Sequence, residues 1–462
     1  MMRQSKKNKS VSVARRVALE VLRRVEAENA FASLALDHAL MRRGVRKSED
    51  RRLATELVYG TLRWRRRLDY ALAAHSRRSL DRIEPTLLRI LRMTAYQLLF
   101  LDRVPAWAAV DEGTSLAVAI RGSRAGGFVN AVARGLASAL DRIEWPDPEG
   151  RERPVRALGI LHSFPDWMVE SWLDLLGMQR AVSLMESLNI PAPLWVRANT
   201  LRVKPEGLCN LLSASGVDAV PEKSVPDALT LKGSINLREL AAHEAGLMHV
   251  QDAAAQAVCL LLAPKPGQRV LDACAAPGGK TATIAQLMEN KGEVLAMDAH
   301  PARLGLVRKL ADRLGIKIVQ TELADASETS KDVLGQFDRV LLDAPCTALG
   351  VIRRHPESKW RLLSSDIDRM VELQEALLDA MAPLVAPGGY LVYSICSFSP
   401  AEGPELIERW LARHPEFIRH DPRTEKRSGW HSLLDAQAQM RTWPDENKMD
   451  GFFAVRLQRQ GD

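Results

Sequence analysis

Apolar residues recur at helical spacing along the first third of the chain. The recurrence is clearest in VARRVALEVLRRV, LATELVYGTLRW and PTLLRILRMTAYQLLFL, where they fall three and four positions apart. This spacing is typical of one face of an α-helix. Gly44, Gly60 and Pro85 fall beside or inside these segments, and we expect them to interrupt the helices. The pattern predicts a compact helical bundle over residues 12–145.

A boundary is expected at IEWPDPEGRERP, which is rich in proline, glycine and charge. Beyond it the pattern is mixed. A helix is predicted around residues 166–176 and another in KPEGLCNLLSAS, and strands are predicted in LWVRANTL, DALTL and INL. This alternation over a short stretch predicts a small α+β module at residues 146–245.

From about residue 250, strand-like and helix-like segments alternate regularly. Strands are predicted in RVLDA, EVLAMD, IKIVQ, RVLLDA and YLVYSI, with FIRHD and FFAVRL completing the sheet. Helices are predicted between them in TATIAQLME, ARLGLVRKLADRL and DIDRMVELQEALLDAMAPL. Such alternation favours a parallel, doubly wound sheet. We therefore expect three domains, at residues 1–145, 146–245 and 246–462.

Positive charge is concentrated in the predicted bundle. The whole chain carries a formal net charge of +7, yet residues 1–145 alone hold 28 Lys and Arg against 15 Asp and Glu. Forked guanidinium groups suit contacts to phosphate, so the densest cluster predicts RNA binding. Its members are Arg42, Arg43, Arg46, Arg51, Arg52, Arg63, Arg65, Arg66 and Arg67. The alternative is a solvated helical face paired with Glu49, Asp50 and Glu56.

The cysteine spacing and the lengths of the apolar runs predict the cellular compartment. The five cysteines show no C-x-x-C or Cys/His spacing, so neither a disulfide framework nor a metal site is expected. No run of about 18 apolar residues occurs, and the basic N-terminus has no apolar segment behind it. We expect a cytoplasmic protein that neither spans a membrane nor is secreted.

The stretch RVLDACAAPGGKTATI predicts a strand, a glycine loop and a helix whose N-terminus can approach a ligand. The loop is consistent with two types of ligand. The loop resembles a phosphate-binding P-loop, although Cys274 stands where that motif needs glycine. The second strand, in contrast, ends in Asp298, which is placed to bind ribose hydroxyls, and Asp325 follows the third strand, where it can meet an adenine edge. Either acid could instead cap a helix.

Two further strands end in polar groups. The fourth is followed by DAPCTALG, with Asp343 and Cys346, and the fifth ends in SICS, with Cys396. Neighbouring parallel strands lie about 4.8 Å apart, so both thiols are expected to face one pocket. A thiolate there can add to an electron-poor carbon. Cys209 and Cys259 are expected to be small buried hydrophobes.

Several stretches resemble the signatures of one enzyme family. LDACAAPGGKT, DAPCTALGVIRRHP, YSICS and DGFFAVRL resemble those of the S-adenosylmethionine-dependent RNA cytosine-5 methyltransferases of the NOL1/NOP2/Sun family, and GLMHVQDAAAQAV resembles the segment leading into their catalytic domain. The N-terminal third, on segments such as LATELVYGTLRW, resembles the NusB-like RNA-binding domain of bacterial members. The resemblance spans essentially the whole chain. It implies a NusB-like bundle, a small α+β RNA-binding module and a Rossmann-like methyltransferase domain.

The resemblance implies methylation of C5 of a cytosine in 16S rRNA, and it suggests the one at position 967. In the family the later cysteine adds to C6, so Cys396 would be the nucleophile. Cys346 would then assist loss of the C5 proton and release of the product, and Asp343 would hold the base. In related DNA enzymes the nucleophile follows a proline, as Cys346 does, so the opposite assignment stays open. A monomer without a metal is expected.

The resemblance also implies a cofactor cleft. The residues concerned are Cys274, Ala275, Ala276, Pro277, Gly278, Gly279, Lys280, Asp298, Asp325 and Asp343. Lys280 could contact the cofactor, orient Asp343 or be a solvated lysine. Two departures stand out, because Ile395 replaces the usual threonine and Gly403 the usual asparagine. They are the support for an alternative, a non-catalytic RNA-binding assembly factor. Another alternative keeps the reaction but takes tRNA or 23S rRNA as substrate.

Overall fold

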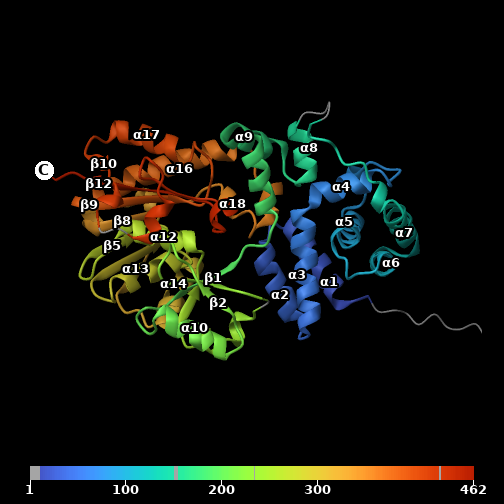
Figure 1. Cartoon of the computed structure of the whole chain (residues 1–462), viewed down its shortest axis with the longest axis horizontal. Coiled ribbons are helices and arrows are strands. Elements are labelled where there is room, and N and C mark those ends of the chain that lie inside the picture. Colours follow the sequence, from blue (N-terminus) through green and yellow to red (C-terminus); the bar gives the residue numbers. More distant parts are fainter. Residues whose placement is uncertain (1–10, 150–153, 234, 426–427, 462) are drawn as a thin grey trace, which may run out of the picture. The chain divides into compact units, whose positions relative to one another are not determined.

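The computed structural model describes residues 11–149, 154–233, 235–425 and 428–461 (Figure 1). The basic segment of residues 1–10 and part of the expected boundary at residues 143–154 lie outside the described residues. The chain forms two compact units. One comprises Met1–Ile190 with Ile352–Leu362, and the other comprises Pro191–Val351 with Leu363–Asp462.

The first unit is helical, which confirms the predicted bundle. Its helices are α1 (Val13–Ala27), α2 (Ala32–Arg42), α3 (Ser48–Arg63), α4 (Arg65–Ala73), α5 (Pro85–Phe100), α6 (Ala106–Arg121), α7 (Ser123–Ala137), α8 (Pro154–Leu161) and α9 (Asp166–Leu188). Local chemistry sets their starts. Pro85 occupies the first turn of α5, where its missing N–H costs no hydrogen bond, and the Glu84 side chain accepts from the Leu87 N–H at 3.0 Å.

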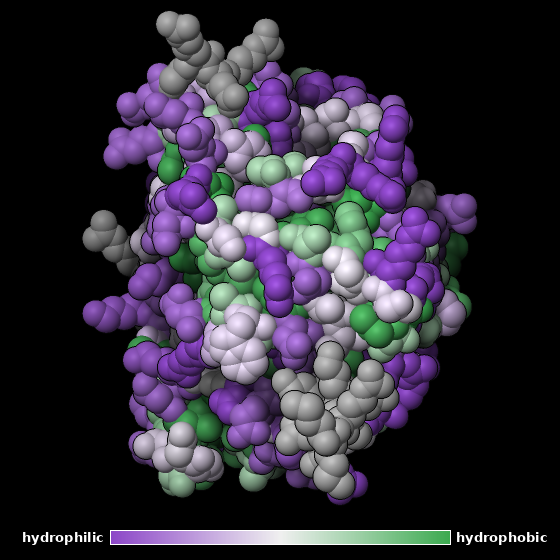
Figure 2. All heavy atoms as spheres, turned by 90° about the vertical axis from the view of Figure 1, so that its right-hand side faces the viewer, coloured by the Kyte–Doolittle hydropathy of each residue, from purple (hydrophilic) through white to green (hydrophobic). Residues whose placement is uncertain are grey.

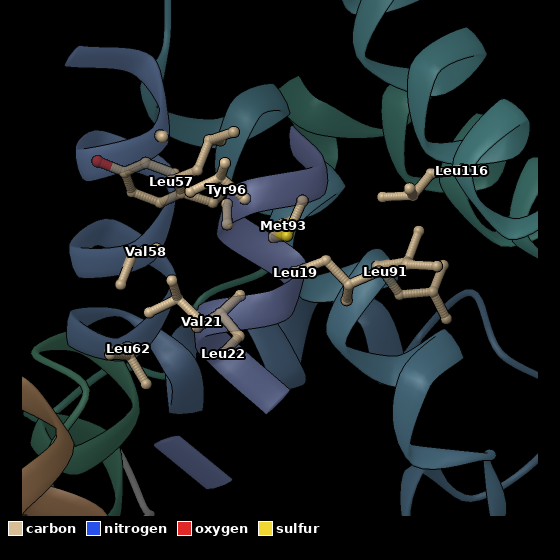
Figure 3. Packing of buried hydrophobic residues seen from close by; sticks show 14 of the residues in the cluster. Leu19, Val21, Leu22, Leu57, Val58, Leu62, Leu91, Met93, Tyr96 and Leu116 are labelled. Carbon is tan, nitrogen blue, oxygen red and sulfur yellow. The ribbon is translucent and has the colours of Figure 1, made fainter. Parts of the chain in front are cut away.

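Close packing, rather than a break, explains Gly60. Leu22, Leu57 and Leu91 are buried in the bundle core shown in Figure 3, and burying each contributes about 1.5–3 kcal/mol. The prediction that Gly60 interrupts a helix is wrong, because it lies inside α3. A Cβ there would lie 2.0 Å from Cζ of Tyr96, so glycine makes room for the ring that α5 packs against α3.

The segment Ile352–Leu362 is anchored deep in the first unit. Lys359 is fully buried, and its ammonium donates to the carbonyls of Arg63 and Ser163, each at 3.2 Å, and to Oδ1 of Asn189 at 2.7 Å. Burial lowers the pKa of this lysine well below its usual value. Trp360 Nε1 donates to the Leu62 carbonyl at 2.6 Å. These contacts make the segment part of the helical core.

The second unit begins with a small antiparallel sheet in the order β2-β3-β1-β4. Its elements are β1 (Leu194–Ala198), α10 (Pro205–Ala214), β2 (Ala219–Pro221), β3 (Ala228–Leu231), α11 (Ala241–Glu244) and β4 (Met248–Val250). The prediction of an α+β module is confirmed, but the strand predicted in INL is wrong. Asn236 donates to Oε1 of Glu239 at 2.6 Å, a local bond that favours the 3₁₀ turn Leu237–Glu239. β4 supplies the missing strand, pairing Val250 with Val196.

The larger sheet has the order β10-β12-β9-β8-β5-β6-β7, and β11 pairs with β12. Its strands are β5 (Arg269–Asp272), β6 (Glu293–Asp298), β7 (Val319–Leu323), β8 (Phe337–Asp343), β9 (Val385–Ile395), β10 (Phe417–Arg419), β11 (Met440–Thr442) and β12 (Phe452–Arg459). β5 to β9 run parallel, which confirms the doubly wound prediction. β7 starts later than expected, because the Ile316 N–H donates to the Ala311 carbonyl and closes the preceding helix.

Helices cover both faces of this sheet (Figure 1). They are α12 (Ala253–Leu262), α13 (Gly279–Leu287), α14 (Pro301–Leu314), α15 (Lys331–Leu334), α16 (Asp366–Met381), α17 (Pro404–Arg413) and α18 (Pro444–Asn447). Val270 packs with residues of α12 and α13, whereas its neighbour Leu271 packs with residues of α16 and α17. Successive strand residues thus enter opposite cores. No described helix is long and apolar enough to cross a membrane.

Candidate active site

The glycine loop connects β5 to α13 and is tied to β6. The Ala275 N–H donates to the Met297 carbonyl at 2.8 Å, and the Ala276 N–H donates to Oδ2 of Asp298 at 3.3 Å. Gly278 has φ of +104°, and a Cβ there would lie 3.0 Å from Cα of Val307. Only glycine fits that backbone and that close approach. The loop therefore brings bare backbone to the carboxyl ends of the strands, where ligands of such sheets bind.

A cleft of about 390 Å³ opens at these strand ends. Seven predicted residues line it: Cys274, Ala276, Asp298, Asp325, Asp343, Cys346 and Cys396. Ala275, Pro277, Gly278, Gly279 and Lys280 belong to the loop and the start of α13 but are not among the lining residues. Burial raises the pKa of the Cys274 thiol, so this cysteine stays protonated. The structure thus gathers most of the predicted set around one space.

The two acids at the strand ends accept hydrogen bonds from the turns that follow them and also line the cleft. Asp298 is largely buried, and its Oδ1 accepts from the His300 N–H at 2.9 Å. Asp325 is exposed, and its Oδ1 accepts from the N–H and the hydroxyl of Ser327 at 2.9 and 2.7 Å. These bonds lower the pKa of Asp325. These bonds are compatible with ligand binding, because a carboxylate has about four acceptor positions.

Sequence reasoning missed several lining residues. Arg303, in the first turn of α14, donates to the Ala276 carbonyl at 3.2 Å and lies 3.9 Å from Oδ2 of Asp298. Leu373 and Leu377 of α16 add an apolar wall. Arg303 could have been found from its place directly after the strand that ends in Asp298. The two leucines, four positions apart, could have been found from helical periodicity.

The two thiols meet in the cleft. Asp343 at the end of β8 pairs in register with Ser394 near the end of β9, so the loops that follow start side by side. Sγ of Cys346 lies 3.5 Å from Sγ of Cys396. The hydrogen bond to Cys396, burial and the charges of Cys396 and Glu402 raise the pKa of the Cys346 thiol well above its usual value.

Cys259 and Cys209 do not line the cleft. Cys259 is fully buried in α12, and burial raises the pKa of its thiol to about 12. Cys209 packs at the edge of the small sheet's core. Within the described ranges, no group of three His, Cys, Asp or Glu residues could hold a metal ion.

Lys280 is paired with Asp343 rather than solvated. Its Nζ donates to Oδ2 of Asp343 at 2.6 Å, and the hydroxyl of Ser394 donates to Oδ1 at 2.6 Å. Burial lowers the pKa of Lys280, but the charge and hydrogen bond of Asp343 outweigh it, so the pKa lies above its usual value. The pair fixes the Asp343 carboxylate beside the thiols. Lys280 is also engaged and so is not free to meet a triphosphate, as a P-loop would require.

The predicted arginine cluster divides into two groups. Arg42 and Arg43 are exposed and both pair with Glu20, not with the predicted acids. Arg46 and Arg52 are also exposed. Figure 2 shows hydrophilic side chains around an apolar central area on the face that it draws.

The arginines from position 63 onward contact other residues of the helical unit. Arg63 is buried and donates to the Arg353 carbonyl at 3.4 Å. Arg66 pairs with Asp166 at 2.7 Å, and the Arg67 guanidinium lies 4.4 Å from the ring centre of Trp145. Arg65 lies over the ring of Trp360 at 5.5 Å.

Three family models match successive parts of the chain. Residues 12–138 match the NusB family, and residues 164–238 match the ferredoxin-like domain of the RsmF/B-like methyltransferases. Residues 259–458 match the 16S rRNA methyltransferase RsmB/F model. The matched parts follow the order bundle, small module and methyltransferase domain.

Relatives match over nearly the full length. The probable ribosomal RNA small subunit methyltransferase B of Bacillus subtilis is 35% identical over 97% of this chain and 99% of its own. Ribosomal RNA small subunit methyltransferase B of Salmonella newport is 33% identical over 88% of this chain and 90% of its own. The crystal structure of PH0851 matches with a TM-score of 0.81 at 28% identity, covering 99% of this chain and 100% of its own. The resemblance drawn from the cysteine motifs is confirmed, and the chain belongs to the ribosomal RNA small subunit methyltransferase B family.

Proposed function

We propose that the protein transfers a methyl group from S-adenosylmethionine to C5 of a cytosine in 16S rRNA, the one at position 967. The observation that carries the proposal is the 3.5 Å approach of the Cys346 and Cys396 sulfurs within the cleft that the glycine loop borders. Membership of the family supports an rRNA substrate and argues against tRNA. It also makes 16S rather than 23S rRNA the favoured substrate.

The cleft suits the cofactor. Its volume falls within the range of about 300–1,000 Å³ that small-molecule pockets occupy. Asp298 is placed for ribose hydroxyls and Asp325 for an adenine edge, while Leu373 and Leu377 offer apolar surface. The acidic lining also suits a sulfonium cation. Bound there, S-adenosylmethionine would supply an electrophilic methyl group.

The two cysteines then divide the chemistry. Cys396 is the proposed nucleophile, as in the related enzymes, and its sulfur lies 3.5 Å from that of Cys346. Its thiolate would form a bond to C6 of the cytosine, which makes C5 nucleophilic. C5 would then take the methyl group, and S-adenosylhomocysteine would be the leaving group. Cys346 assists removal of the C5 proton, after which the Cys396–C6 bond breaks. Asp343, held by Lys280 and Ser394, orients the base. The base must leave its stack to reach both sulfurs.

The two departures from the family pattern do not touch this chemistry. Ile395 is fully buried and packs in the apolar core with Tyr393 and Phe453. At Gly403, a Cβ would lie 3.2 Å from the ring of Phe453. Neither residue lines the cleft. They therefore give little support to a non-catalytic assembly factor.

RNA would be held by the exposed arginines at positions 42, 43, 46 and 52 and by half-buried Arg51, together with the small sheet module. Arg63 is buried and would not contact the RNA. Residues 1–145 and 146–245 would act as RNA-binding domains and residues 246–462 as the catalytic domain. The protein would work as a monomer in the cytoplasm.

The roles of the two thiols can be tested on gels. Cys346→Ala should accumulate a covalent complex with 16S rRNA that survives denaturing electrophoresis, because the adduct forms but is not released. Cys396→Ala should form none, since no sulfur attacks C6. The opposite pattern would exchange the two roles.

The substrate can be tested in cells. Bisulfite sequencing of RNA from a strain lacking the gene should show loss of 5-methylcytosine at position 967 of 16S rRNA. A signal lost from tRNA or 23S rRNA instead would overturn the proposed substrate.

A further inference from the structure

A buried carboxylate lies between the two cysteine loops. Glu402 follows β9 and is fully buried. Its Oε1 accepts from the Thr347 N–H at 2.8 Å and from Nε2 of Gln374 at 3.1 Å. Its Oε2 accepts from the hydroxyl of Ser397 at 2.6 Å and from the hydroxyl of Thr347. Four donors thus meet the roughly four acceptor positions of one carboxylate.

The donors have a particular place in the sequence. Thr347 directly follows Cys346, and Ser397 directly follows Cys396. Their hydroxyls lie 3.0 Å apart, although the two residues lie in loops that follow different strands. Gln374 of α16 also donates to the carbonyl of Pro345 at 2.8 Å. One carboxylate therefore ties together the residues that flank both thiols.

The carboxylate is itself held in place. The hydroxyl of Tyr393 donates to the Glu402 carbonyl at 2.7 Å, and the Glu402 N–H donates to the hydroxyl of Ser399 at 3.4 Å. Hydrogen bonds to an ionised group are roughly twice as strong as neutral ones. Glu402 is therefore a firm anchor for both loops.

We propose that Glu402 is a positioning residue, whose carboxylate fixes the loops of Cys346 and Cys396 so that both sulfurs converge on one pyrimidine ring. Glu402 is not among the residues that line the cleft. The inference rests on the methyl transfer proposed above. Its effect follows from geometry, because a displacement of about 1 Å at a reacting group can lower a rate about 100-fold.

Disulfide closure measures the spacing of the sulfurs without any methyl transfer. Diamide takes two electrons and two protons from the two thiols, joins Cys346 to Cys396 and becomes a hydrazine. Closure in the wild-type full-length chain should be fast, because the sulfurs are 3.5 Å apart. Glu402→Ala should slow it at least tenfold. Glu405→Gln is the matched control, an exposed glutamate three residues away, and should close at the wild-type rate.

Steady-state kinetics give the second measurement. Glu402→Ala should lower kcat about 100-fold, with the KM for RNA within about twofold of wild type. The kcat of Glu402→Gln should lie between those of wild type and Glu402→Ala. Its amide oxygen can still accept from the Thr347 N–H, and its NH₂ group can donate to hydroxyls that turn to accept. This partial rescue would not be expected of a residue that only fills space.

The two proposals fail in different ways. Closure at the wild-type rate in Glu402→Ala would overturn the positioning role, even if the enzyme methylates C5. Slowed closure in a protein whose wild type does not methylate C5 would leave positioning intact and overturn the proposed function. If Glu402→Ala loses S-adenosylmethionine binding and native circular dichroism, Ser397→Ala replaces it. That variant removes one of the four bonds, and closure at an unchanged rate would again overturn the role.

Discussion

Asp272 is a buried acid at the end of β5, next to the glycine loop. Its Oδ2 accepts from the hydroxyl of Thr281 at 2.7 Å, while Oδ1 has no partner among the described residues. Burial raises the pKa of Asp272 from 3.8 to about 7, against the opposing effect of the Thr281 hydrogen bond. The folded protein therefore binds this proton more tightly than the unfolded chain does.

This shift predicts a pH dependence of stability. Between pH 4 and 7 the unfolded chain has lost the proton while the folded protein still holds it, so rising pH lowers the free energy of unfolding. In Asp272→Asn the carboxyl group is replaced by an amide, which does not titrate, so this pH dependence is lost. We expect its stability relative to wild type to be about 3 kcal/mol greater at pH 8 than at pH 4, measured by urea unfolding.

The matched control is Asp312→Asn, which makes the same chemical change at an exposed site on α14. Its stability relative to wild type should not change with pH. Parallel pH profiles for Asp272→Asn and wild type would contradict the account of the buried carboxyl.

At the residue scale, the sequence predicts groups whose chemistry is visible in their type. The thiols of Cys346 and Cys396 and the glycine loop could be placed at strand ends, and they line one cleft or border it. The partners of these groups could not be found in the same way. Glu402 lies in the segment that follows Cys396, but its carboxylate also accepts from the Thr347 N–H beside Cys346. No periodic pattern marks such a long-range hydrogen bond.

At the scale of elements, long periodic segments were predictable and short ones were not. β6 coincides with the predicted EVLAMD. Both faces of this strand are buried, so its sequence is a continuous apolar run that is easy to find. β4 and β11 span three residues each, too few to show any period. Gly60 misled for a different reason, since glycine in a helix can mark a close contact as well as a break.

The Gly60 contact predicts a loss of stability from a substitution that normally helps a helix. Gly60→Ala should lower the free energy of unfolding by about 1–3 kcal/mol, because the added methyl collides with the ring of Tyr96. Gly127→Ala in α7 is the control, since nothing lies within 4 Å of the added Cβ. There we expect a gain of about 0.5–1 kcal/mol. Equal effects at the two sites in chemical denaturation would refute the steric explanation.

At the scale of the whole molecule, charge is uneven along the chain. Residues 1–145 carry the positive excess, and Arg46 and Arg52 are exposed within it. The arrangement favours binding of a polyanion by the helical part. Composition alone could indicate this, because net charge does not depend on the details of packing.

Salt titration should report how many phosphates these arginines contact. The double variant Arg46→Gln, Arg52→Gln should weaken binding to a 16S rRNA fragment and reduce the slope of log Kd against log salt by about two. Arg409→Gln, an exposed arginine of α17, should leave the slope unchanged. An unchanged slope in the double variant would remove both side chains from the proposed RNA surface.

The grouping of Ile352–Leu362 with the helical unit could not be predicted. The cage of oxygens around Lys359 is assembled from α3, the loop before α9 and the turn after α9. Such a cage depends on tertiary structure alone.

This interleaving has a practical consequence for anyone who divides the gene. A fragment ending at residue 190 would lack the lysine that fills its interior, leaving oxygens of Ser163 and Asn189 without their donor. A fragment starting at residue 191 would carry that lysine on a loop with nothing to enclose it. Neither fragment corresponds to one of the two units. An exchange of the first unit between relatives would therefore also have to exchange the eleven residues Ile352–Leu362.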